Sequence, residues 1–272
     1  MNTTTNNNSN SNSNAKATKG TLYLVPASLD FGCDSQTALT EVLPDGTLKR
    51  AAQLTHWICE NAKSTRAYLK RVDAIHPLAA PIQEQTITEL PREVHKKGDH
   101  GGKGNAHFDA KPMLAAALAG HDVGLISEAG MPAVADPGSS VVRAAHDLGL
   151  RVQPLVGPVS LLLALAASGL NGQSFAFNGY LPQDAADRTK RAKELESLAI
   201  KHSQSQLFIE TPYRNAALWQ GLLQALSPTT RLAIASGLTL ENANIQSRSV
   251  KQWRDLPCPT DNRTPTVFTI GT

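Results

Sequence analysis

The stretch Asp122-Val-Gly-Leu-Ile126, which continues as Ser127-Glu-Ala-Gly-Met-Pro-Ala-Val-Ala-Asp-Pro-Gly138, indicates the fold class of this chain. A short apolar run followed by a loop rich in glycine and proline is typical of a strand that ends in a rigid turn. Beyond the loop, the sequence predicts a helix to about residue 148 and a second strand over 151–156. Together these elements form a βαβ unit, in which the two strands run parallel. The stretch therefore predicts an α/β fold with a parallel sheet.

Strand and helix patterns continue on both sides of this unit. Upstream, the sequence predicts strands over 21–25 and 55–59, and helices over about 48–54, 62–70 and 111–118. Downstream, it predicts a helix that ends near residue 169, strands over 174–179 and 206–210, and helices over 187–202 and 215–226. Three short β-like runs close the chain, at 232–235, 245–250 and 266–270. We expect two α/β domains, over 20–158 and 159–272, the second with a mixed sheet.

Composition narrows the class of protein. The chain has 272 residues, of which 26 are basic and 23 acidic, so its charge requires neither a nucleic acid nor a membrane surface as partner. Its three cysteines, Cys33, Cys59 and Cys258, are far apart and odd in number, which argues against a disulfide framework and a zinc clip. The mostly polar segment 1–19 predicts a disordered leader. Because no apolar run is long enough to span a bilayer and no secretory signal is seen, we expect a cytoplasmic protein without a membrane partner.

Several loops fall where ligands of open α/β sheets bind, beyond the carboxyl ends of the strands. These loops are 26–29, 60–63, 127–137, 157–160 and 210–214. Glycine and proline in the 127–138 loop would fix its backbone and let a ligand approach closely. The same loop is compatible with a plain connecting turn in which Asp136 caps the next helix. A nucleophilic role for Ser127 is disfavoured, because no G-x-S-x-G elbow surrounds it.

The loops at 157–160 and 210–214 each admit a functional and a structural interpretation. Residues 157–160 could hold a carboxylate or phosphate against helix amides, or serve as an ordinary helix cap. Glu210, Tyr213 and Arg214 could meet a ligand, or form a solvated loop with one surface salt bridge.

Two further clusters carry charged or ligating side chains. Glu60, Lys63 and Arg66 suit a polyanion or a nucleoside hydroxyl, and equally a charged helix start. The segment His95 to His107 holds three histidines, but their spacing matches no compact zinc pattern. We expect this segment to be a mobile surface loop, and we expect no metal site.

Four segments occur in one order along the chain: Leu22-Tyr-Leu-Val-Pro26, Ser127-Glu-Ala-Gly-Met-Pro132 with Asp136-Pro-Gly138, Pro154-Leu-Val-Gly-Pro-Val-Ser160, and Glu210-Thr-Pro-Tyr-Arg214. In this order they resemble the tetrapyrrole methylase superfamily, whose members use S-adenosylmethionine (SAM). The resemblance is greatest to the branch of the ribosomal small-subunit RNA 2′-O-ribose cytidine methyltransferase, and it runs from about residue 20 to 270. Several spaced motifs in one order are more specific than any one of them.

The resemblance implies two αβα domains with SAM bound in the cleft between them, commonly as a homodimer, and no metal. The residues that it implies for SAM binding are Pro26, Glu128, Ala129, Gly130, Met131, Pro132, Gly157, Pro158, Val159, Ser160, Ile209, Glu210, Thr211, Pro212, Tyr213, Pro265 and Thr266. At the acceptor end of the site we expect Glu60, Lys63 and Arg66 to be catalytic. Glu60 is the residue expected to take or orient a hydroxyl proton.

Departures from that branch affect the expected substrate. The branch carries Glu-Asp-Thr-Arg near its first helix, whereas this chain has Glu60-Asn61 and reaches an arginine only at Arg66. Its Asp-Ala-Gly is replaced by Glu128-Ala-Gly130, and the opening loop lacks the usual Ile-Gly-Asn. RNA methylation, with ribosomal RNA or the small ribosomal subunit as partner, is the leading function, and the lysines of the His95 to Lys103 segment would meet phosphate. The alternatives are methylation of a small cyclic tetrapyrrole-like substrate, and a non-catalytic SAM- or RNA-binding module.

Overall fold

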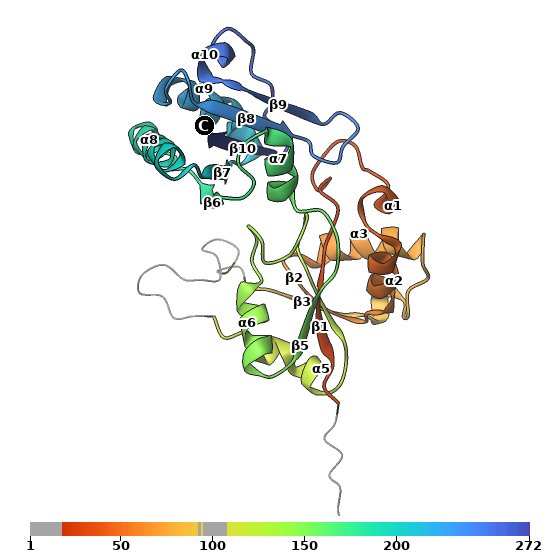
Figure 1. Ribbon diagram of the computed structural model, residues 1–272. Helices are drawn as coiled ribbons and strands as arrows, with labels where there is room; N and C mark the ends of the chain where they lie inside the picture. Colours follow the sequence, from red (N-terminus) through yellow and green to blue (C-terminus); the bar gives the residue numbers. More distant parts are fainter. Residues whose placement is uncertain (1–17, 92–93, 95–107) are drawn as a thin grey trace, which may run out of the picture.

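The computed structural model describes residues 18–91, 94 and 108–272. In these parts of the chain two five-stranded sheets form separate lobes, one before residue 155 and the other after residue 159 (Figure 1). The expected two-domain α/β fold is confirmed. The domain boundary placed between residues 158 and 159 falls near the end of the link between the sheets and stays a prediction. The predicted leader, apart from Thr18 and Lys19, and the predicted loop from His95 to His107 lie outside the described residues.

The N-terminal sheet consists of parallel strands. They are β1 (Thr21–Val25), β2 (His56–Cys59), β3 (Thr86–Glu89), β4 (Val123–Ile126) and β5 (Arg151–Pro154), in the order β3-β2-β4-β1-β5. Both β4 and β5 pair with β1 in parallel, and α6 (Ser139–Asp147) connects them, so the predicted βαβ unit is confirmed. Because parallel strands end at the same edge of a sheet, the loops after β1, β2 and β4 meet there.

Helices cover both faces of this sheet (Figure 1). On one face, α2 (Asp45–Gln53) and α3 (Ala62–Asp73) pack against Tyr23, Val25 and Trp57. On the other face, the 3-10 helix η2 (Lys111–Leu114), α5 (Ala115–Leu118) and α6 pack against Leu22, Ile58 and Leu125. Successive side chains of a strand point to opposite faces, so the near-continuous apolar runs of β1 and β4 fit strands buried on both sides.

The C-terminal sheet is mixed, as predicted. Its strands are β6 (Phe175–Tyr180), β7 (Ser205–Ile209), β8 (Arg231–Ser236), β9 (Asn244–Ser249) and β10 (Thr266–Gly271), in the order β6-β7-β10-β8-β9. The β6–β7 pair is parallel and the other pairs are antiparallel. One face packs against α8 (Ala185–His202) and α9 (Asn215–Ala225), and the other against α7 (Ser160–Ser168) (Figure 1).

Short elements account for most differences from the sequence prediction. The strand β3 was not predicted, because three of its four residues are exposed at the sheet edge and carry no apolar alternation. The helices α1 (Leu39–Val42) and α10 (Val250–Trp253), and the 3-10 turns η1 (Ile82–Glu84) and η3 (Pro212–Arg214), are too short to show a helical period. No helix in the described ranges is both long and apolar enough to cross a membrane.

Candidate active site

A cavity of about 420 Å³ lies between the two domains, and we call it the interdomain cavity. From the N-terminal domain, residues of the 29–32 and 129–136 segments line it. From the C-terminal domain come the start of α7, the end of β6, the turn after β7 and the 237–238 and 263–267 segments. Apolar side chains, among them Met131, Leu161 and Val267, make up much of its wall. Segments far apart in the sequence therefore converge on one site.

Two backbone hydrogen bonds fasten the loop after β4 to the loop after β1. The amide of Ala27 donates to the carbonyl of Gly130 at 2.9 Å, and the amide of Gly130 donates back at 3.2 Å. Gly130 has φ 69°, which a glycine adopts without steric cost. Ala133 and Ala135 have φ values of 65° and 66°, which are costly for alanine. Backbone strain of this kind clusters at functional sites, and here it lies beside the cavity.

The link into α7 is shaped by a close backbone approach. A β-carbon at residue 157 would lie 2.3 Å from Cγ of Pro26, so Gly157 is the residue that fits. The N-cap residue of α7 is Val159, and no side chain of the described residues caps this end. The first amides of α7 therefore lie at the cavity wall without a side-chain cap, where a polar ligand group can accept their hydrogen bonds.

The turn after β7 is organised by Glu210. Its carboxylate accepts hydrogen bonds from the amide of Thr211 at 2.7 Å and from its hydroxyl at 3.1 Å. The same oxygen pairs with Nη2 of Arg214 at 2.7 Å. Because Glu210 is buried and Arg214 half-buried, this pair holds the turn rigidly against the cavity. It is a structural ion pair rather than the solvated surface bridge that was one interpretation of the sequence.

Three carboxylates gather at the N-terminal side of the interdomain cavity. Burial, together with the charges of Glu60 and Glu128, raises the pKa of Asp136 to about 7. Asp136 lines the cavity, and the N-cap position of α6 is taken by Gly138 and not by Asp136. Burial and the Asp136 charge also raise the pKa of Tyr180, whose side chain lines the same cavity. The carboxylates make this end of the cavity electronegative.

A second cavity of about 420 Å³ opens beside the first, and we call it the polar cavity. It lies within the N-terminal domain, between the loop after β1, α3 and the end of β4. Most of its lining residues carry a hydroxyl, amide or charged side chain. The lining residues are Ala27, Ser28, Asp30, Phe31, Gly32, Gln36, Asn61, Lys63, Ser64, Thr65, Ala67, Tyr68, Arg71, Ile126, Ser127 and Glu128. Phe31 and Gly32 line both cavities, so the two adjoin at these residues.

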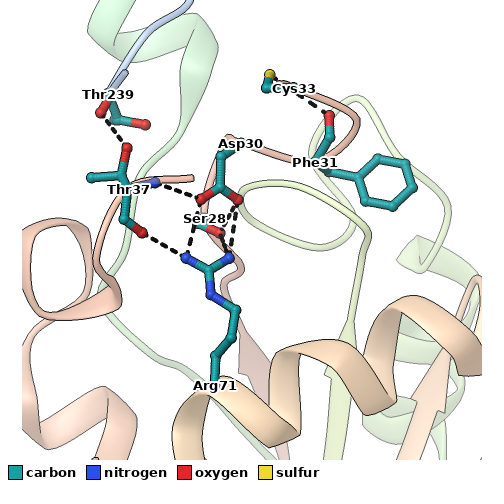
Figure 2. A network of polar contacts seen from close by, with 7 residues as sticks. All are labelled: Ser28, Asp30, Phe31, Cys33, Thr37, Arg71 and Thr239. Carbon is teal, nitrogen blue, oxygen red and sulfur yellow. Dashed lines mark hydrogen bonds and ion pairs between the residues drawn. The ribbon is translucent and has the colours of Figure 1, made fainter. Parts of the chain in front are cut away.

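Arg71 ties down the loop that separates the cavities (Figure 2). Its guanidinium donates to Ser28 Oγ at 3.1 Å, to the Asp30 carboxylate at 3.2 and 3.1 Å, and to the carbonyl of Thr37 at 2.6 Å. Burial raises the pKa of Asp30, but the hydrogen bonds from Arg71 and Ser28 outweigh it and hold that pKa below 3.8. The loop also reaches the other domain, because the hydroxyl of Thr37 donates to the carbonyl of Thr239 at 2.8 Å. We call the Ser28, Asp30 and Arg71 network the clasp.

A family model of the tetrapyrrole (corrin/porphyrin) methylases matches residues 51–252. This chain belongs to the tetrapyrrole methylase family. The ribosomal RNA small subunit methyltransferase I of Vibrio cholerae serotype O1 is 32% identical over 180 residues, which are 60% of this chain and 61% of that protein. The protein of the same name from Mesorhizobium japonicum is 40% identical over 132 residues, 48% of this chain and 44% of that protein. The chain thus spans between 44% and 61% of the length of these two relatives.

A solved structure of the methyltransferase CobJ has the same fold, with a TM-score of 0.55 at 17% sequence identity. The match covers 93% of this chain and 94% of that one. The expected membership of the tetrapyrrole methylase superfamily is confirmed by the family model, and the expected architecture by this likeness.

The residues predicted to bind SAM fall into two groups, those that line the interdomain cavity and those that do not. Those that line it are Ala129, Gly130, Met131, Val159, Ser160, Ile209, Glu210, Thr211, Pro212, Pro265 and Thr266. Those that do not are Pro26, Glu128, Pro132, Gly157, Pro158 and Tyr213. Some of the second group support the wall, as Pro26 does by packing on Gly157, whereas Tyr213 is 68% exposed with the Arg214 guanidinium over its ring.

The predicted catalytic residues separate in the structure. Lys63 lines the polar cavity. Glu60 lies near enough to Asp136 and Tyr180 for its charge to raise the pKa of both. Arg66 is exposed on α3 and lines neither cavity. Of the three, Lys63 therefore lines a cavity and Glu60 belongs to the carboxylate cluster.

Sequence reasoning gave no functional weight to Asp30, Phe31, Tyr68, Arg71 or Tyr180. Asp30 and Arg71 are 41 residues apart, and no local sequence pattern predicts an ion pair between residues at that separation. For Asp136 a signal was present in the Asp-Pro-Gly segment, but the only role considered for its side chain was helix capping, as one of two interpretations of the loop.

Proposed function

We propose that this chain binds SAM in the interdomain cavity and transfers its methyl group to a ribose hydroxyl of small-subunit ribosomal RNA. The observation that carries the proposal is the convergence of the family's separated loops, from both domains, on one cavity. Relatives with 32% and 40% identity are named ribosomal RNA small subunit methyltransferase I, which supports RNA as the substrate class.

The residues of the interdomain cavity fit SAM in size and in chemistry. A volume of about 420 Å³ lies within the range of cofactor pockets. Apolar side chains such as Met131 and Val267 suit the adenine and thioether parts, and the hydroxyls of Ser160 and Thr211 suit the polar parts. The carboxylate of Asp136 on the wall favours a sulfonium cation.

When bound, SAM supplies an electrophilic methyl carbon, and transfer to a hydroxyl leaves one proton to be removed. Asp136 is placed to accept that proton, because it lines the cavity and its pKa of about 7 matches a general base at neutral pH. Glu60 acts on this step by raising the pKa of Asp136. The protein must also align the acceptor hydroxyl with the methyl group. The rigid loops around the cavity provide this alignment.

The proposal extends to partners and location. Lys63 on the polar cavity and Arg66 on the exposed face of α3 supply positive charge for the RNA backbone. The active form is a homodimer, and the chain works in the cytoplasm, where small ribosomal subunits are its substrate. Analytical ultracentrifugation at micromolar concentration should therefore return the mass of two chains.

The cofactor part of the proposal is tested by calorimetric titration of the protein with SAM. The wild type should bind, and Ser160→Trp should lose at least about 30-fold in affinity, because the indole fills the cavity. Gln83→Trp is the matched control, since this exposed residue lines neither cavity and should bind SAM normally. Equal affinity of all three proteins would place SAM elsewhere.

The substrate part is tested with methyl-labelled SAM and small ribosomal subunits from cells that lack the methylation. Label should enter the RNA, and nuclease mapping should find it on a ribose. A salt series should show falling RNA affinity with a steep negative slope, because phosphate contacts release counterions. SAM binding without label transfer to RNA would leave the cofactor proposal standing and reject the RNA substrate.

A further inference from the structure

Two hydroxyl groups of the polar cavity are buried without a partner. Tyr68 is 6% exposed and Ser127 is 5% exposed, and both line this cavity. Neither the Oη of Tyr68 nor the Oγ of Ser127 has a hydrogen-bond partner among the described residues. A buried hydroxyl that makes no hydrogen bond destabilises a fold, so most such groups in proteins are satisfied. The two hydroxyls therefore indicate that the cavity receives a ligand with hydrogen-bonding groups of its own.

The charges of the polar cavity favour a neutral ligand. The carboxylates of Asp30 and Glu128 and the cations of Lys63 and Arg71 balance on its wall. Arg71 is committed to the clasp, where Asp30, Ser28 and the carbonyl of Thr37 take its hydrogen bonds. Because these hydrogen bonds occupy the Arg71 guanidinium, it cannot also bind a phosphate inside the cavity. Sugar hydroxyls and the polar edges of a base match the unsatisfied Tyr68 and Ser127 hydroxyls better.

Phe31 supplies an aromatic surface where the polar cavity meets the interdomain cavity. Its side chain is 47% exposed and lines both cavities. Figure 2 shows its ring turned away from the clasp that anchors the loop. Proteins that take up single bases stack them on such rings. A base on Phe31 would lie next to the cavity assigned to the methyl donor.

From these observations we infer that the polar cavity binds one nucleoside of the RNA acceptor. The hydroxyls of Tyr68 and Ser127 hydrogen-bond to it, and its base stacks on Phe31. The nucleoside leaves the RNA stack and enters the N-terminal domain, while the donor stays in the interdomain cavity. This inference rests on the proposed RNA methylation and adds to it the place and the side chains that hold the acceptor.

The variants Tyr68→Phe and Ser127→Ala test the inference, because each removes a single hydroxyl oxygen. Each should raise the KM for RNA roughly fivefold, and the double variant about 20-fold, with SAM affinity unchanged. Each should also keep or raise the melting temperature, because a buried unsatisfied hydroxyl is removed. Tyr23→Phe is the matched control, since Tyr23 is a buried tyrosine that lines neither cavity, and it should leave the KM for RNA unchanged. Unchanged KM in the double variant would overturn the inference while leaving wild-type RNA methylation intact.

A second arm decides the inference even if RNA is not methylated. Saturation-transfer NMR with free cytidine should give a signal with the wild type that the Tyr68→Phe, Ser127→Ala double variant loses. Inorganic phosphate added in excess should not displace the cytidine. Absence of a cytidine signal with the wild type, or displacement by phosphate, would overturn the assignment of a nucleoside to this cavity. A positive signal without RNA methylation would instead reject the proposed function alone.

Discussion

The two cavities have the same volume, about 420 Å³ each, but differ in how they are built. The interdomain cavity needs both sheets, since its wall joins the loop after β4 to α7 and to the turn after β7. The polar cavity is lined by the N-terminal domain alone. Its shape depends on Arg71, which anchors the loop after β1. A change at the domain interface should therefore affect the proposed donor site, and a change in the clasp should affect the proposed acceptor site.

The linings of the two cavities differ in polarity, and this difference matches the ligand proposed for each. Apolar side chains and backbone turns dominate the interdomain cavity, which suits a flat nucleoside donor with a positive sulfur. The polar cavity has more hydroxyl, amide and charged side chains on its wall, among them Tyr68 and Ser127, whose hydroxyls have no hydrogen-bond partner in the described part of the chain. The loop centred on Phe31 thus lies between the proposed donor site and the proposed acceptor site.

The largest expected effect is on the chemistry at the junction. Asp136→Asn should lower the rate of methyl transfer by about 10²-fold, the usual contribution of a general base. In the wild type the rate should rise with pH and level off above about 7, the pKa to which burial and the Glu60 and Glu128 charges raise Asp136. The variant should lose this inflection. A rate profile that is flat between pH 6 and 8 in the wild type would contradict the role of Asp136.

The stability of the same variant provides an independent check. A carboxyl group with a raised pKa binds more protons in the folded state than in the unfolded state between about pH 4 and 7. The free energy of unfolding of the wild type should therefore fall across this interval. Asp136→Asn should remove that slope and be the more stable protein at pH 8. Urea titrations at several pH values measure both.

Next in size is the effect of opening the clasp. Arg71→Met should lower the free energy of unfolding by about 2–3 kcal/mol, because it leaves the Asp30 carboxylate buried without its cation. The loss is smaller than for a fully buried pair because the Arg71 side chain is 25% exposed and water screens the charge. Because the pKa of Asp30 is lowered in the fold, the difference from wild type should shrink as pH falls below about 4. The matched control, Lys49→Met, breaks an exposed pair with Asp45 and should not measurably change unfolding at neutral pH.

A smaller effect, on the KM for RNA, is expected from changes to the Phe31 side chain between the two cavities. Phe31→Leu should raise the KM for RNA about fivefold, near the low end of a lost stacking contact, and Phe31→Trp should restore it. SAM affinity should change less than the KM for RNA, because Phe31 is only one of many side chains on the interdomain wall. Steady-state kinetics and calorimetry separate the two. Equal loss in Phe31→Leu and Phe31→Trp would argue for a shape requirement rather than stacking.

The smallest effect is expected at Tyr213. It was expected to bind SAM, but it is exposed and lies outside the interdomain cavity, unlike its neighbours Thr211 and Pro212. Tyr213→Ala should therefore keep SAM affinity within about twofold of the wild type. A tenfold loss in the same titration would mean that SAM extends beyond the cavity onto the outer side of this turn.

Local patterns were enough for much of the fold. Apolar β-prone runs bounded by glycine and proline predicted the strands that become β1, β2 and β4, and helical spacing predicted α3, α8 and α9. The edge strand β3 escaped because exposed Thr86, Thr88 and Glu89 read as loop residues. Burial on both faces produces a strong signal, and exposure at an edge produces a weak one.

The candidate site was predictable only as far as its motifs are local. Residues 129–131 and 209–212 were expected at a cofactor and line the interdomain cavity. The polar cavity was not anticipated, because its parts come from β1, α3 and β4, and its clasp joins Asp30 to a residue 41 positions away. Which side chains converge across such separations depends on the packing of the sheet, and no single segment encodes it.

The central claim is that donor and acceptor occupy different cavities, and a crystal structure with S-adenosylhomocysteine tests it most directly. We predict density for the nucleoside in the interdomain cavity, bounded by Met131, Thr211 and Thr266, with the polar cavity left to solvent. Density for the ligand beside Tyr68 and Ser127 would contradict the account, because the donor would then fill the cavity assigned to the acceptor.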